Sequence, residues 1–223
     1  METIGGLATI PSRESTLRYI IDSILPQVDH LYVAFNDYSE LPIWLTEYSQ
    51  KLHFFLTEKD NMGDAEKFRF VEEFEDAIYC SIDDDLIYPP FYVKNLIRGI
   101  EKYDCVVSLH GRVYPRPVQS FAKWSMNYRC LGKVTGGADC DLLGTGCMAF
   151  STKRLKLKYE DFLERNMADV WVSKVSHEQG VPLKVLKHSS TYLTYIPQKE
   201  TIWRSEQRGK FERQTEILKS FLK

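Results

Sequence analysis

The chain contains 223 residues, of which 43% are hydrophobic and 27% are charged, and its formal net charge is −2. This composition is typical of a folded globular protein and excludes a disordered or fibrous one. The small net charge gives no electrostatic basis for binding nucleic acid or an anionic membrane. No window approaches the roughly 18 apolar residues that a membrane-spanning helix needs.

The cysteine pattern and the N-terminus indicate the compartment. Five cysteines, an odd number without C-x-x-C spacing, are scattered along the chain, at Cys80, Cys105, Cys130, Cys140 and Cys147. We expect neither a disulfide framework nor a zinc site, which fits a reducing environment. The opening "METIGGLATIPSR" lacks the basic region and long apolar core of a signal peptide. We therefore predict a cytoplasmic protein without an integral membrane segment.

Short apolar runs alternate with amphipathic stretches over the first half of the chain. We predict strands over 4–10, 30–36, 52–57, 77–83 and 105–111, and helices over 14–28, 63–75 and 89–103. The near-continuous apolar run at 77–83 is typical of a buried parallel strand. This alternation predicts an α/β fold with a Rossmann-like, mostly parallel sheet flanked by helices.

After residue 111 the pattern becomes less regular. Residues 112–146 contain turns and aromatic side chains without a clear period. A strand at "CMAFS" (147–151), a helix over 165–180, a strand over 182–188 and a terminal helix are predicted to follow. Since we find no internal repeat and no low-complexity linker, we predict a single domain.

Three consecutive carboxylates, Asp83, Asp84 and Asp85, follow the predicted strand at 77–82. In open α/β sheets ligands bind at the carboxyl ends of strands, and backbone alternation places Asp83 and Asp85 on one side of the chain. Two converging carboxylates suit Mg²⁺ or Mn²⁺, with phosphate oxygens and water as further ligands. Such a cation stabilises a diphosphate leaving group. The alternative is a solvated acidic turn that caps the next helix.

Two segments together suggest a family. "LATIPSR" (7–13) and "YCSIDDDLIYP" (79–89) resemble the nucleotide-sugar-dependent glycosyltransferases of the GT-A fold, family 2 in particular. The resemblance covers residues 4–110 well and the remainder loosely. It implies a metal-dependent hexosyltransferase of polysaccharide biosynthesis that uses a nucleoside-diphosphate sugar, such as a UDP-sugar, with Mn²⁺ or Mg²⁺ at a D-x-D motif. Residues 1–111 would form the donor-binding half, and 112–223 the acceptor-binding and C-terminal half of the same domain.

The resemblance assigns donor-binding roles by position. The matches are Thr9, Ile10, Pro11 and Arg13 in the first loop, Asp37 near the nucleobase, and Asp83 and Asp85 on the metal or ribose. Backbone alternation directs Asp84 away from that side, unless the chain turns there and brings it toward the sugar. "NMGDAEKF" (61–68) is similar to the family's Asn-x-Gly loop, where Gly63 permits close backbone approach and Lys67 reaches a phosphate. Each match has an ordinary alternative, such as a turn for Asp37 or a solvated lysine for Lys67.

Inverting transfer needs a general base that takes the proton of the acceptor hydroxyl. The resemblance places this base near the start of a helix well after D-x-D, which matches Asp169 of "NMADVWVS". This lone acid in an apolar segment should be partly desolvated. A helix-capping role for Asp169 is the alternative, and Asp139 and Asp141 compete as the base. The acidic triplet is also similar to that of the retaining exostosin-type transferases, so the stereochemistry stays open.

Several later residues complete the expected site. The resemblance implies a third metal ligand from a late strand, which matches His188, and His110 is an alternative pocket residue. Trp203, Arg204 and Arg208 could close over the diphosphate, and a solvated charged tail is the alternative. The Gln-x-x-Arg-Trp segment of processive family 2 synthases is absent, so we do not expect a polymer synthase.

The acceptor is expected to be a hydroxyl of a glycan or lipid-linked saccharide, and no nucleic-acid partner is expected. Two other classes stay open. A sugar-1-phosphate nucleotidyltransferase shares the sheet and the carboxylate-bound Mg²⁺, but the Gly-rich first loop with Lys or Arg is absent here. A non-catalytic carbohydrate-binding domain whose acids bind Ca²⁺ would need more oxygen ligands than the triplet offers.

Overall fold

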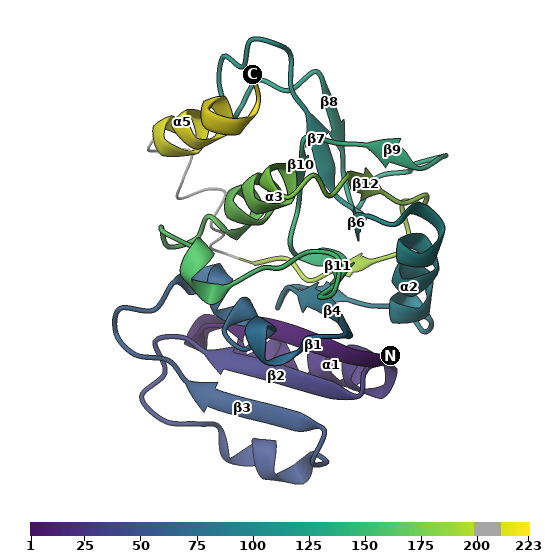
Figure 1. The fold of residues 1–223 in the computed structure, drawn as a ribbon. Helices are drawn as coiled ribbons and strands as arrows, with labels where there is room; N and C mark the ends of the chain where they lie inside the picture. Colours follow the sequence, from purple (N-terminus) through teal and green to yellow (C-terminus); the bar gives the residue numbers. More distant parts are fainter. Residues whose placement is uncertain (199–210) are drawn as a thin grey trace.

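The computed structural model describes residues 1–198 and 211–223. Its centre is an eight-stranded mixed sheet with the order β3-β2-β1-β4-β11-β6-β12-β9 (Figure 1). The strands are β1 (Glu2–Thr9), β2 (His30–Phe35), β3 (Leu52–Leu56), β4 (Ala77–Ile82), β6 (Val106–Ser108), β9 (Ala138–Asp139), β11 (Cys147–Ser151) and β12 (Leu183–Val185).

Most strands of this sheet run in one direction. β1 pairs in parallel with β2 and β4, β2 pairs in parallel with β3, and β6 pairs in parallel with β12. Only β11, inserted between β4 and β6, and β9 run the opposite way. The predicted α/β fold with a mostly parallel sheet is therefore confirmed. The carboxyl ends of β1, β2, β4 and β6 meet at one edge.

Helices cover both faces of the sheet (Figure 1). They are α1 (Glu14–Ile24), α2 (Tyr92–Tyr103), α3 (Ala168–Glu178) and α5 (Glu212–Phe221). One core contains α1 and α2, and the other contains α3 and α5. The predicted apolar face of the first helix is buried, through Leu17, Ile20, Ile21 and Ile24. No helix within the described residues has both the length and the apolar character needed to cross a membrane.

The predicted helix over 63–75 is replaced by two 3-10 helices, η4 (Gly63–Phe68) and η5 (Val71–Glu73). This segment lies directly on β1, because a Cβ at Gly6 would come within 2.0 Å of the Lys67 carbonyl oxygen. That carbonyl accepts a hydrogen bond of 2.6 Å from the Tyr79 hydroxyl. A carbonyl used in this tertiary contact does not require a continuous α-helix to satisfy it.

The sequence pattern did not resolve the shortest strands of the structure. The predicted strand over 105–111 divides into β6 and β7, and β7 joins a second sheet with the order β10-β7-β8. A third sheet pairs β5 with β13. The additional strands are β5 (Leu86–Ile87), β7 (Gly111–Val113), β8 (Met126–Tyr128), β10 (Leu142–Leu143) and β13 (Thr194–Tyr195). Strands this short present too few residues for a period of two to be recognised.

Candidate active site

The end of β1 and the end of β4 lie side by side, because the two strands pair in parallel with Leu7 opposite Ile82. Thr9 ends β1 and is buried, and the 3-10 helix Pro11–Arg13 follows it. Arg13 is 8% exposed, and its Nε lies 3.8 Å from Oδ1 of Asp84. Two residues predicted for donor binding therefore face each other as a largely desolvated ion pair.

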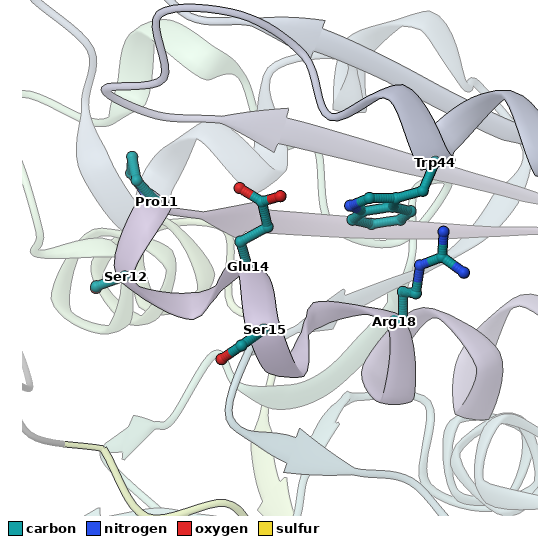
Figure 2. Close-up of a pocket in the computed structure, with 6 residues that line it drawn as sticks. All are labelled: Pro11, Ser12, Glu14, Ser15, Arg18 and Trp44. Atoms are coloured by element: carbon teal, nitrogen blue, oxygen red, sulfur yellow. The ribbon is translucent and has the colours of Figure 1, made fainter.

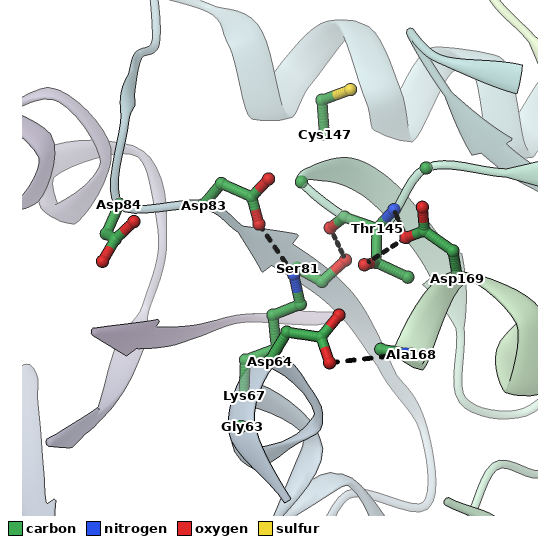
Figure 3. Close-up of polar contacts among 12 residues, drawn as sticks. Gly63, Asp64, Lys67, Ser81, Asp83, Asp84, Thr145, Cys147, Ala168 and Asp169 are labelled. Carbon is green, nitrogen blue, oxygen red and sulfur yellow. Dashed lines mark hydrogen bonds and ion pairs between the residues drawn. The ribbon is translucent and has the colours of Figure 1, made fainter. Parts of the chain in front are cut away.

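Asp83 has a different cationic partner. The ammonium of Lys67 donates a hydrogen bond of 2.8 Å to Oδ1 of Asp83 (Figure 3). Lys67 is 3% exposed, and burial alone would lower its pKa. The neighbouring carboxylates of Asp83 and Asp64 outweigh this effect and raise the pKa of Lys67. The acidic triplet is therefore partly neutralised by the protein's own Lys67 and Arg13.

The remaining carboxylates of the triplet are poorly compensated. Burial and the charges of Asp83 and Asp84 together raise the pKa of Asp85 to about 7, although Arg13 opposes this shift. Burial also raises the pKa of Asp84 to about 6, although Arg13 opposes this shift. Among the described residues, more carboxylates meet here than Arg13 and Lys67 neutralise, so an added cation would be stabilised.

Asp169 lies in the first turn of α3 and is oriented by the segment before β11. Its Oδ1 accepts hydrogen bonds of 2.7 Å from both the backbone N–H and the hydroxyl of Thr145 (Figure 3). The carbonyl of Thr145 in turn accepts a hydrogen bond of 2.5 Å from Ser81 on β4. Asp169 is thus anchored to the same strand end that bears the acidic triplet.

Asp64 belongs to this arrangement, although the sequence analysis gave it no role. Burial raises its pKa to about 7, Lys67 lowers it, and the charge of Asp169 raises it again. Its Oδ1 accepts a hydrogen bond of 3.4 Å from the backbone N–H of Ala168. The three-residue spacing between Asp64 and Lys67 could have indicated that Asp64 lies in the site, because residues three apart share one face of a 3-10 helix.

Two glycines permit close packing in the site. Gly63 has φ +65°, and a Cβ there would lie 1.9 Å from Oδ1 of Asn166. A Cβ at Gly146 would lie 1.9 Å from Oδ2 of Asp83. At Gly63, the residue that approaches closely is Asn166 of the same chain. At Gly146, any side chain would displace Asp83.

Asp37 follows β2 and has φ +61°. Its Oδ1 accepts a hydrogen bond of 3.0 Å from the Asn61 amide, and its Oδ2 accepts one of 2.9 Å from Arg165. The residue lies at the carboxyl edge of the sheet, as predicted, and its two bonds join the loop after β2 to the segments that contain Asn61 and Arg165. Its assignment to a nucleobase stays a prediction.

His188 has a different environment from the one expected of a metal ligand. Its Nδ1 lies 2.8 Å from the carbonyl oxygen of Leu186, and its Nε2 lies 3.2 Å from that of Arg129. Both ring nitrogens thus lie near backbone carbonyls, and the assignment of His188 as a metal ligand stays a prediction. Over residues 1–198 and 211–223, no three His, Cys, Asp or Glu side chains form a group that could hold a metal by themselves.

The competing candidates for the base are ion-paired. Asp139, on the edge strand β9, pairs with Lys184, and Asp141 pairs with Arg116 at 2.7 Å. These partners set them apart from Asp169, because within the described residues the hydrogen bonds to the Asp169 carboxylate come from Thr145. The loop residues expected to cover a diphosphate, Trp203, Arg204 and Arg208, lie outside the described residues.

A hollow of about 520 Å³ adjoins the first loop (Figure 2). It is lined by Pro11, Ser12, Glu14, Ser15, Arg18 and Trp44. The guanidinium of Arg18 lies 4.8 Å from the Trp44 ring centroid and is paired with Glu47 at 3.0 Å. The hollow shares Pro11 and Ser12 with the loop after β1, but the acidic triplet does not line it.

No family model and no curated protein sequence matches this chain. Among solved structures, the chain is similar to S. aureus TarS 1–349, a glycosyltransferase, with a TM-score of 0.55 and 14% identity over 88% of this chain and 60% of that one. It is also similar to TarS 1–349 in complex with UDP-GlcNAc, with a TM-score of 0.55 and 12% identity over 92% and 61%. The chain thus spans about three fifths of the TarS chain. This likeness shows that the two proteins share a fold.

Proposed function

We propose that this protein is a nucleotide-sugar-dependent glycosyltransferase of the GT-A, family 2-like type. The convergence of Arg13, Lys67, Asp83, Asp84 and Asp169 at the carboxyl ends of β1 and β4 supports this function best. Ligands of open α/β sheets bind at this edge. The shared fold with TarS, whose complex contains UDP-GlcNAc, supports a donor of the same class.

The donor set suits Mn²⁺ or Mg²⁺. Asp83 uses Oδ1 for Lys67, which leaves Oδ2 for a cation, and Asp85 is a partly buried carboxylate whose pKa is raised to about 7 by desolvation and its acidic neighbours. These metals are bound by one or two carboxylates together with substrate phosphates, so the two side chains suffice once a diphosphate is present. The bound cation would supply positive charge that stabilises the departing nucleotide.

We assign donor binding to the residues around this edge, namely Thr9, Pro11, Arg13, Asp37, Gly63, Lys67, Asp83 and Asp84. The buried cations Arg13 and Lys67 each bind one carboxylate of the triplet and so set its side chains in different directions. We assign acceptor binding to the second half, 112–223, because Thr145 and Asp169 come from it. The acceptor is a hydroxyl of a glycan or lipid-linked saccharide.

Asp169 is proposed as the general base of an inverting transfer. Its Oδ1 is oriented by two bonds from Thr145, which leaves Oδ2 to take the proton of the acceptor hydroxyl. The oxygen of the acceptor then forms the new bond to the sugar C1 while the bond from C1 to the diphosphate oxygen breaks. The hydrogen bonds to Oδ1 keep the carboxylate aimed throughout this step.

Thermal unfolding with UDP and Mn²⁺ tests the donor site, because a ligand that binds only the folded protein raises Tm. We expect Tm to rise with the two together, and this rise to disappear in Asp85→Asn. The Asp169→Asn variant should keep the rise but transfer sugar about 100-fold more slowly or worse. The exposed Asp60→Asn is the control. No shift with any nucleoside diphosphate in the wild type would contradict the proposal.

A further inference from the structure

A pocket of about 440 Å³ lies in the second half of the chain, and the function proposed above assigns it no ligand. Two segments line it, 133–135 and 187–189. Val134 and His188 join these segments as an antiparallel pair, because the backbone N–H of each donates to the carbonyl of the other, at 2.9 and 3.0 Å. The two walls of the pocket are therefore held in a fixed register.

This register directs the polar side chains of both segments to one face. Successive side chains of an extended backbone point to opposite faces. Val134 and His188 are buried, whereas the four residues that flank them are exposed. These four residues are Lys133, Thr135, Lys187 and Ser189. The outer face of the pair thus presents two ammonium groups and two hydroxyls at one pocket.

The charge around this pocket is positive. The chain as a whole contains 31 acidic and 29 basic residues, yet neither Asp nor Glu occurs over 105–138 or 179–198. Within residues 1–198 and 211–223, Lys133 and Lys187 form no ion pair, whereas the nearby Lys184 is paired with Asp139. Like charges on facing segments repel each other. An anion from outside the chain would therefore stabilise this arrangement.

The pocket lies at the same edge of the main sheet as the acidic triplet. β12, which precedes 187–189, runs parallel to β6, and both β6 and β4 pair antiparallel with β11. The chain after β12 therefore leaves the sheet at the carboxyl end of β4. It then returns to the triplet, because the Ile196 N–H donates a hydrogen bond of 2.8 Å to the carbonyl of Asp85. One short segment thus joins the pocket to the proposed donor site.

We propose that this pocket binds a phosphate group of the acceptor, so that the acceptor of the transferase is a phosphate-bearing saccharide. Lysine binds phosphate as a point charge, and the hydroxyls of Thr135 and Ser189 can donate to further phosphate oxygens. The role in transfer rests on the function proposed above, whereas the anion site itself does not.

The diphosphate of the donor has a different place in the molecule. In the described part of the chain, the residues that line the pocket include no member of the acidic triplet. Both lining segments belong to 112–223, the half assigned to the acceptor. The same phosphate chemistry occurs in the diphosphate of a lipid-linked saccharide and in a phosphate ester of a soluble glycan, and both present their oxygens to the two lysines in the same way.

Isothermal titration of the full chain with pyrophosphate tests the anion site. A chelating buffer removes divalent cations and so suppresses binding at the proposed donor site. We expect the double variant K133Q/K187Q to bind pyrophosphate at least about tenfold more weakly than the wild type, because two charge-assisted contacts are lost. The matched control K94Q, at an exposed lysine of α2, should bind like the wild type. No binding to the wild type, equal affinity in the double variant, or sulfate binding as tight as pyrophosphate would overturn the proposal.

Two acceptor probes, titrated in saturating UDP and Mn²⁺, test the role in transfer. They are N-acetylglucosamine 1-phosphate and methyl N-acetylglucosaminide, which lacks the phosphate. The wild type should bind the phosphate form at least about tenfold more tightly. The K133Q/K187Q variant should lose this preference but keep the Tm rise caused by UDP and Mn²⁺. Equal binding of both probes by the wild type would refute the acceptor role.

A third probe, N-acetylglucosamine linked to farnesyl diphosphate, separates the two sources of phosphate. Binding tighter than that of the sugar phosphate, and again dependent on Lys133 and Lys187, assigns the site to lipid-linked acceptors. Equal or weaker binding assigns it to soluble phosphate-bearing glycans. A wild type whose Tm does not rise with UDP and Mn²⁺ would instead refute the proposed function, while the pyrophosphate titration still decides whether the pocket is an anion site.

Discussion

Lys67 connects the carboxylates of the candidate site to one another. Its ammonium is almost fully buried and donates to Asp83, and it also lies in the field of Asp64. A buried lysine is stable only when carboxylates accompany it. The side chain therefore serves the folded structure as well as the proposed donor site.

Replacing Lys67 with methionine keeps the aliphatic volume and removes the charge. We expect the free energy of unfolding to fall by about 2 kcal/mol, the range of a hydrogen bond to a charged group. The loss is not larger because the side chain of Asp83 is 43% exposed and water replaces part of the lost bond. Urea unfolding measures the change. The exposed Lys59→Met should cost less than about 0.5 kcal/mol, and equal losses in the two variants would contradict this role.

The raised carboxyl pKa values predict how stability depends on pH. Desolvation at their partly buried positions raises the pKa of Asp84 to about 6 and that of Asp85 to about 7, against an ordinary value of 3.8. The folded protein therefore binds more protons than the unfolded chain between pH 4 and pH 7, by the linkage of protonation to folding. This stabilisation is complete below the ordinary pKa and is lost as the pH rises through about 6 to 7.

In a chelating buffer, the free energy of unfolding should fall by at least about 1 kcal/mol between pH 5 and pH 8. Urea unfolding at several pH values measures this. The Asp85→Asn variant should show a shallower fall, whereas Asp60→Asn, at an exposed position, should follow the wild type. A free energy of unfolding that rises between pH 5 and pH 8 in the wild type would contradict the raised pKa of Asp85.

At the scale of elements, the turn before η4 depends on the backbone freedom of Gly63. This glycine has φ +65° and packs against Asn166, whose Oδ1 accepts a hydrogen bond of 3.2 Å from the Asp64 N–H. The contact joins η4 to the start of α3 and so brings Asp64 close to Asp169. Gly180, after α3, has nearly the same φ of +64° but no atom within 4 Å of a built Cβ.

This pair of glycines separates backbone strain from a steric clash. The Gly180→Ala variant should lower the free energy of unfolding by about 1 kcal/mol, the cost of a left-handed backbone for alanine. The Gly63→Ala variant adds the clash with Asn166 and should cost about 3 kcal/mol. Urea unfolding compares the two. Equal costs would mean that the contact with Asn166 relaxes freely.

Periodicity identified the longer elements but not the form of the short ones. The face of α1 through Leu17, Ile20 and Ile21 was recognisable because it repeats every three to four residues. Residues 63–75 show a similar amphipathic pattern but form 3-10 turns, since η4 packs directly on β1 at Gly6. The pattern within residues 63–75 contains no information about a contact with a strand almost sixty residues earlier in the chain.

At the scale of the whole molecule, the two predicted halves share one sheet. β11 comes from the second half and lies between β4 and β6 of the first half. β6 therefore has β11 and β12 as its neighbours, and both lie after residue 111. The donor-side strand β4 depends in the same way on the acceptor-side segment that contains Cys147.

A fragment of residues 1–111 should consequently fail to fold by itself. Without β11 and β12, β6 loses both neighbours and one edge of β4 is left unpaired, so the apolar faces of these strands are exposed. We expect no cooperative urea transition for the fragment and a single transition for the full chain. A fragment that unfolds cooperatively near the midpoint of the full chain would show that the first half is an independent domain.

The sequence by itself determined the α/β class, the strand that bears Asp83, Asp84 and Asp85, and the loop that contains Arg13. These features depend on local periodicity and on the rule that ligands bind at the carboxyl ends of parallel strands. Only the tertiary structure decided that Lys67 and Arg13 neutralise different members of the triplet. It also placed Asp64, which the sequence analysis left without a role, beside Asp169.

The tertiary structure likewise gave the His188 ring two backbone carbonyl partners, one of them from Arg129 in a distant part of the chain. Such pairings join residues far apart in the chain through the order of strands in the sheet. Neither composition nor periodicity contains that order, because each describes only neighbours along the chain.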